Sequence, residues 1–133
     1  MNEAVIVLLT LSYSLILGII VAQVVLTAPV AFKVLDNDNA SNFLRAIFPR
    51  YYLLLFLICL VASLISYLWF SSMDLWIALG ASILAFIGFI IIPLTNSARD
   101  RGWNRLFKFL HNLSVLNTII LFIIAVAQLI RIS

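Results

Sequence analysis

The chain has 133 residues, of which 65% are hydrophobic and only 10% are charged, and its mean hydropathy is +1.23. Soluble domains carry about 25% charged and about 45–50% apolar residues, so the composition excludes that class and predicts a single-domain integral membrane protein. The formal net charge of +3 does not indicate nucleic-acid binding, because the basic residues lie at the ends of apolar segments. The single cysteine, Cys59, excludes an internal disulfide and a cysteine-rich metal site.

Four apolar segments follow one another, and each is long enough to cross about 30 Å of hydrocarbon. We predict an all-α antiparallel four-helix bundle with spans at about residues 4–34, 51–70, 75–93 and 106–130. Pro29 predicts a kink or a helix end, Pro49 suits the first turn of the second helix, and Pro93 is expected to close the third. Residues 36–42 and 96–105 are predicted loops on one side, and residues 71–74 form a tight turn on the other.

Basic residues are distributed unequally between the two predicted sides of the membrane. Seven lie in or beside the first and third loops, whereas Arg131 is alone on the opposite side; the seven are Lys33, Arg45, Arg50, Arg99, Arg101, Arg105 and Lys108. Short cytoplasmic loops are enriched in lysine and arginine, so both termini are predicted to lie outside the cytoplasm. The expected location is the inner membrane of a bacterium.

Small residues recur at one-turn spacing in two of the segments. Such stripes allow close approach of a second helix in the membrane. They predict helix-packing positions at Ser14, Gly18 and Ala22 in the first segment and at Ala81, Ala85 and Gly88 in the third.

The fourth segment has one polar stripe in an otherwise apolar helix. At about 100° per residue, one arc holds the only histidine, His111, with Ser114, Asn117 and Thr118, and continues to Ala125 and Gln128. Polar groups in a membrane are costly without partners, so the stripe is predicted to face the bundle. His111 is expected to bond a polar group of another helix or a backbone carbonyl near Pro29 or Pro93. Structural helix–helix bonding and ligand binding both remain open for it.

Three sequence blocks together carry a family resemblance: TAPVAFKVLD at 27–36, FLRAIFPRYY at 43–52 and FKFLHNLSVLN at 107–117. They resemble a family of small four-helix membrane proteins catalogued as a domain of unknown function (number 4149), to which transmembrane protein 205-like proteins are related. The resemblance implies a fold and a membrane location but no activity. The entrance motif of the second helix adds Arg50 and Tyr52 to the candidates for the polar core or a ligand site. Ile92 departs from the family pattern, where this position is often polar.

Three functions fit these features. The first is an accessory or assembly subunit that packs with other membrane proteins, with itself or with lipid; the chain lacks the usual acid–base pair of an enzyme. The second is a haem- or porphyrin-binding oxidoreductase that uses His111 as its axial ligand. If the protein binds a metal ion instead, His111 is the candidate ligand. The chain is similar in size and helix count to the bacterial haem-containing protoporphyrinogen oxidase. However, the first segment of this chain reads LLTLSYSLILG and lacks the histidine of that enzyme. The third is an oligomeric transporter of a small solute.

Overall fold

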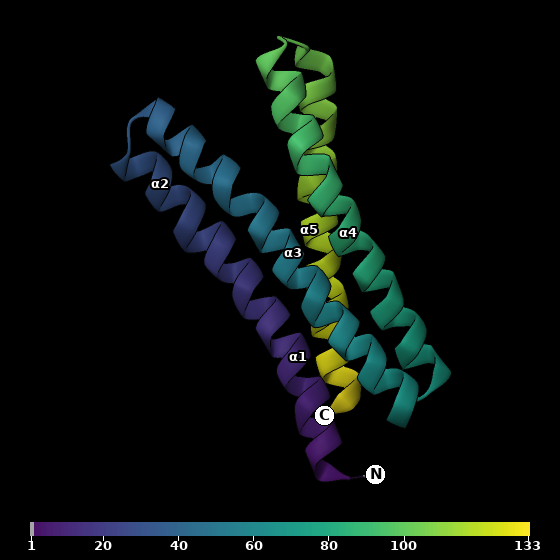
Figure 1. Ribbon diagram of the computed structural model, residues 1–133. Coiled ribbons are helices and arrows are strands. Elements are labelled where there is room, and N and C mark those ends of the chain that lie inside the picture. The colour runs from purple at the N-terminus through teal and green to yellow at the C-terminus, as the bar shows by residue number, and fades with distance from the viewer. Residues whose placement is uncertain (1) are drawn as a thin grey trace.

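The computed structural model describes residues 2–133 as helices joined by short turns (Figure 1). The elements are α1 (Glu3–Val21), the π-helical η1 (Ala22–Thr27), α2 (Ala28–Val34), α3 (Asn37–Trp69), α4 (Ser72–Asp100) and α5 (Asn104–Ile132). Because α1, η1 and α2 continue into one another, they form one rod over Glu3–Val34. This rod and α3, α4 and α5 are four helices long and apolar enough to span a membrane. The predicted all-α antiparallel architecture is confirmed.

The helices are longer than the apolar spans predicted from the sequence. Asp36 caps α3 by accepting from the backbone N–H of Asn39 at 2.8 Å, so most of the predicted first loop is helical. Pro49 lies inside α3 and Pro93 lies inside α4, so the predictions that they start and end helices are wrong. A proline removes one backbone hydrogen bond, and neighbouring helices make this tolerable in membrane-spanning helices. The third loop shrinks to a turn in which Gly102 has φ +71°.

Pro29 does not end the rod, and the helical irregularity begins before it, in the π-helical η1. The irregularity precedes it, where Ala28 N–H donates to the carbonyl of Gln23 and the Thr27 hydroxyl donates to the carbonyl of Ala22 at 3.2 Å. Both bonds span five residues, which is the spacing of a π-helix. This wide turn places Gln23 in a buried position near the end of the first apolar segment.

The main contacts place α1 and α4 each beside both α3 and α5. The core between them combines large side chains with the alanines of α4; among its fully buried large members are Leu9, Tyr13, Ile16, Tyr52, Leu55 and Leu121. Many leucine, isoleucine, valine and phenylalanine side chains remain exposed on the outside. Soluble monomers avoid such continuous apolar surface, whereas a bilayer covers it.

The packing positions predicted in α4 lie inside the bundle, whereas those predicted in α1 lie on its outer face. Ala81, Ala85 and Gly88 are buried in the bundle. In contrast, the stripe Ser14–Gly18–Ala22 lies on the outer face, and no atom lies within 4 Å of a Cβ built on Gly18. The buried face of α1 is formed by larger residues, chiefly Leu9, Tyr13, Ile16 and Ile20, so the small residues face away from the core.

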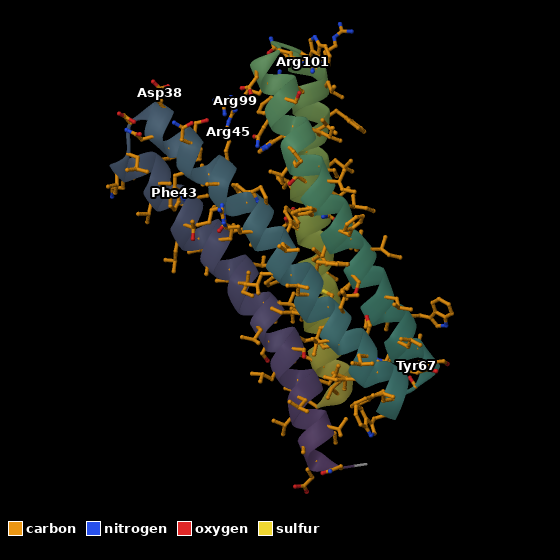
Figure 2. All side chains as sticks on the ribbon, in the orientation of Figure 1. Asp38, Phe43, Arg45, Tyr67, Arg99 and Arg101 are labelled. Carbon is orange, nitrogen blue, oxygen red and sulfur yellow. The ribbon has the colours of Figure 1, made fainter. Side chains whose placement is uncertain are left out.

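At the end that carries most basic residues, the bundle divides into two arms (Figure 1). The first arm is the α2–α3 hairpin and the second is the α4–α5 hairpin. Arg45 of α3 joins them by a two-pronged ion pair with Asp100 of α4, with nitrogen–oxygen distances of 2.8 and 2.5 Å. Figure 2 shows Arg45 and Arg101 at this end, whereas Tyr67 lies at the opposite end.

Candidate functional site

The polar stripe of α5 contacts α3 at Tyr52. The Tyr52 hydroxyl lies 2.9 Å from Thr118 Oγ1, 3.2 Å from Ser114 Oγ and 3.3 Å from the Ser114 carbonyl oxygen. The ring crosses the bundle from α3 to α5 over Gly88 of α4, and it is 1% exposed. A side chain at position 88 would occupy the same space, so this glycine is what lets the tyrosine reach α5. These contacts bring Tyr52, Ser114 and Thr118 together between α3 and α5. Their role in a polar core or in a ligand site stays a prediction.

Asn117 joins α5 to α4 at the same level. Its side-chain Nδ2 donates to the backbone carbonyl of Leu84 at 2.9 Å, and its Oδ1 is buried without a partner in the described chain. Bonds between transmembrane helices contribute roughly 0.6–2 kcal/mol each. Tyr52 and Asn117 therefore act as interhelical anchors, which accounts for their polarity in an apolar bundle.

His111 does not occupy the position predicted for it. Its ring is exposed and stacks on Phe107 with the ring centroids 5.9 Å apart, and within residues 2–133 it has no hydrogen-bond partner. The prediction that it faces the bundle and bonds another helix is therefore wrong. His111 lies one turn before Ser114, on the arm side of the level at which Tyr52 spans the bundle. The two arms diverge toward that end of the bundle (Figure 1). A haem bound through this ring would lie at the surface of the chain, without enclosure by the four helices.

Arg50 also lies away from the Tyr52 cluster. It is exposed, and its guanidinium donates to the carbonyl of Ala46 in its own helix at 2.5 Å. The two ion pairs among the described residues involve Arg45 and Arg131, so Arg50 has no carboxylate partner there. It lines a surface groove with Gln23 and Thr27 of η1 and with Tyr51 and Leu54 of α3.

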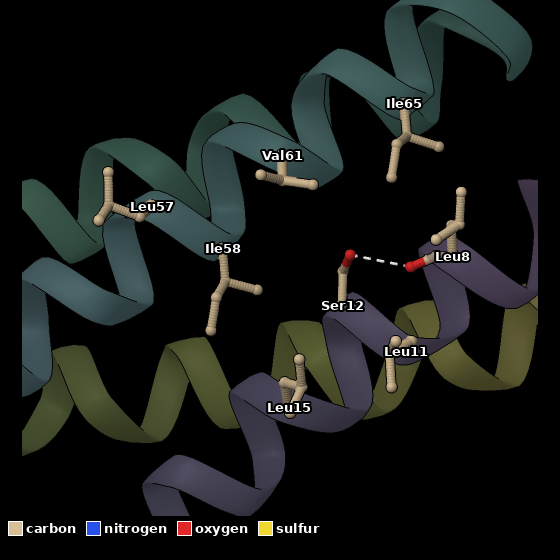
Figure 3. Close-up of a pocket in the computed structure, with 8 residues that line it drawn as sticks. All are labelled: Leu8, Leu11, Ser12, Leu15, Leu57, Ile58, Val61 and Ile65. Carbon is tan, nitrogen blue, oxygen red and sulfur yellow. Dashed lines mark hydrogen bonds between the residues drawn. The ribbon is translucent and has the colours of Figure 1, made fainter.

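A second groove lies between the first rod and α3, nearer the chain's amino terminus (Figure 3). It has a volume of about 300 Å³ and is lined by apolar side chains together with Ser12. The Ser12 hydroxyl donates to the carbonyl of Leu8 at 2.9 Å, so its polarity is satisfied within α1. This part of the surface is suited to hydrocarbon.

The opposite end of the bundle holds a polar cluster that sequence reasoning missed. Asp74, 7% exposed, accepts from Gln128 Nε2 at 3.0 Å, from an Arg131 nitrogen at 3.1 Å and from the Ser71 hydroxyl at 2.5 Å. Asp74 and Ser71 begin α4, while Gln128 and Arg131 are near the end of α5. The sequence positions of these residues could have predicted the cluster, because antiparallel packing brings the start of one helix beside the end of the next.

Among the described residues, no group of three or more His, Cys, Asp and Glu side chains could hold a metal ion. The polar residues brought together are hydroxyls and amides, with Asp74 as the buried carboxylate. Hydroxyls and amides can bind and orient a partner.

Residues 11–104 match the sequence profile of a family described as Domain of unknown function (DUF4149). The chain belongs to this family. No curated protein and no solved structure matches it. The match includes the two blocks at 27–36 and 43–52, whereas the histidine block at 107–117 lies beyond it. As a member of DUF4149, this protein is a four-span membrane protein whose family carries no assigned activity.

Proposed function

We propose that this DUF4149 protein is a non-enzymatic accessory subunit that packs against another membrane protein through the outer face of α1. The observation that carries the proposal is the stripe Ser14–Gly18–Ala22, which is exposed although its spacing suits close helix contact. The bundle's own core is filled on the opposite face of α1, so this stripe is left for a partner outside the four helices.

The distribution of polar groups supports the same proposal. Tyr52 and Asn117 use their hydrogen bonds between helices of this chain, and the two grooves open on the outer surface between the first rod and α3. These features favour action at the lateral surface of the bundle. The proposed location is the inner, or cytoplasmic, membrane of a bacterium.

Photocrosslinking at Ser14 tests this function. A photoreactive amino acid at position 14 is expected to give a discrete protein adduct in native membranes, because the stripe contacts a partner helix. Position 123 is the matched control: Ile123 of α5 is 58% exposed, and helix rise places it at a similar depth. Adducts are resolved by gel and identified by mass spectrometry. Identical lipid-only adducts at both positions would contradict the proposal.

The proposed topology has both termini outside the cytoplasm and both arms inside it, since seven of the eight basic residues lie at the arm end. In a Cys59→Ala background, an impermeant thiol reagent added to intact cells should label Ser133→Cys but not Asn39→Cys or Asn96→Cys. The latter two should react after permeabilisation. Labelling of both arm positions in intact cells would reverse the assigned orientation.

A further inference from the structure

The two surface grooves are parts of one continuous groove. Leu15 of the apolar part and Ile19 of the polar part are one turn apart on α1, and on α3 Ile58 and Leu54 are likewise one turn apart. Residues separated by three or four positions lie on the same helix face. The surface between the first rod and α3 therefore has an apolar part and a part that contains polar donors. We call it the α1–α3 groove.

The polar part contains an amide donor without a hydrogen-bond partner and a guanidinium without a carboxylate partner among the described residues. Gln23 is 6% exposed, and its Nε2 is buried without a hydrogen-bond partner in the described chain, although the side chain lines the groove. Arg50 lines the same part and has no carboxylate partner among the described residues. An amide N–H and a guanidinium favour an acceptor that carries negative charge, and phosphate is one of the two groups whose geometry matches the guanidinium fork.

Helix geometry places these donors at the depth of lipid headgroups. Gln23 is twenty residues from the start of α1, and Arg50 is nineteen from the end of α3. At about 1.5 Å per residue both distances are about 30 Å, the thickness of the hydrocarbon core. If the helix ends mark one interface, Gln23 and Arg50 mark the other, and the apolar part of the groove lies within the hydrocarbon between them.

We propose that the α1–α3 groove binds one anionic glycerophospholipid, with its phosphate at Arg50 and Gln23 and an acyl chain along Leu15, Ile58 and Val61 (Figure 3). The two parts have volumes of about 300 and 280 Å³ and follow one another along the first rod and α3. The π-helical turn contributes by directing Gln23 into the groove, and such turns are frequent at binding sites. The groove borders the proposed partner surface at Ala22, which lines its polar part, whereas Ser14 and Gly18 lie outside both parts of the groove.

Lipid titration of the full-length protein in detergent, followed by native mass spectrometry, tests the proposal. Phosphatidylglycerol is the probe, phosphatidylcholine tests the need for net negative charge, and inorganic phosphate tests for a free-anion site. Arg50→Ala should weaken phosphatidylglycerol binding about tenfold through loss of a charge-assisted hydrogen bond. Arg105→Ala, an exposed basic position at the same end but outside the groove, is the control and should change binding less than about twofold.

A second variant tests the acyl-chain part. Val61 is 52% exposed, so Val61→Trp should fold, fill the groove and also weaken phosphatidylglycerol binding. Equal melting temperatures in lipid-free detergent verify folding of each variant, and Gln23→Leu gives an independent loss of the amide donor. Equal weakening by Arg50→Ala and Arg105→Ala would show diffuse attraction and overturn the proposal. Displacement of the lipid by equimolar phosphate, or full binding by Val61→Trp, would overturn it as well.

Discussion

Gly88→Ala is expected to destabilise the bundle more than any other glycine substitution in the chain. A Cβ at this position would lie 2.7 Å from Cζ of Tyr52 and still closer to Cε1 and Cδ1, far inside the van der Waals contact distance between carbon atoms. The clash involves the ring of a fully buried side chain that cannot move without leaving Thr118 and Ser114. Overpacking with loss of these bonds should cost about 3 kcal/mol.

Thermal unfolding in detergent measures this effect, and Gly80→Ala is the matched control. Gly80 lies in the same helix two turns away, and no atom lies within 4 Å of its built Cβ. Alanine is the better helix former, so this control should be stabilised by about 0.5–1 kcal/mol. Equal effects at the two positions would mean that Tyr52 does not cross the bundle over Gly88.

Asp74→Ala is the second substitution with a large expected effect. The change removes the acceptor for Gln128, whose side chain is fully buried, and leaves its amide unpaired. It also removes the contacts of Arg131 and of the Ser71 hydroxyl at the start of α4. Leaving buried polar groups unsatisfied costs about 1–3 kcal/mol, so we expect a loss near the upper end of that range.

The other interhelical ion pair supplies the control for this experiment. Arg45 and Asp100 also join two helices, but their side chains are 33% and 56% exposed. Exposed pairs contribute about 0–1 kcal/mol, so Asp100→Ala should have a small effect on the free energy of unfolding. Asp74→Asn keeps an oxygen for Gln128 and should fall between the two. An Asp74→Ala protein as stable as Asp100→Ala would show that the cluster is solvated.

The sequence predicts the architecture because four long apolar segments in 133 residues admit few alternatives. It also predicts the Tyr52 cluster in part, since Ser114, Asn117 and Thr118 share one helical arc. The shared arc also predicts that His111 faces the bundle, which is wrong. Helical periodicity gives the direction of a side chain but not the depth at which a neighbouring helix diverges. Local sequence predicts Pro49 at a helix start and Pro93 at a helix end, but the helices continue through both, because neighbouring helices make the lost backbone bond tolerable.

Two further features required the structure. The α1 stripe has the spacing of a packing seam, yet the larger residues of the opposite face fill the core, where their contacts provide more van der Waals attraction. Gln23 and Arg50 line one groove because of which faces of the first rod and α3 meet, and because the π-helical turn shifts the register of the face by one residue. Neither is encoded in a local pattern.

Gly18→Leu most directly tests the claim that this protein acts through the outer face of α1. The variant is measured twice: by unfolding in detergent and by photocrosslinking from position 14 in native membranes. Because no atom lies within 4 Å of the built Cβ of Gly18, the melting temperature should match that of the parent protein. The protein adduct should disappear, because a leucine separates the partner helix from the stripe. A lower melting temperature, or an adduct that persists unchanged, would contradict the proposed function.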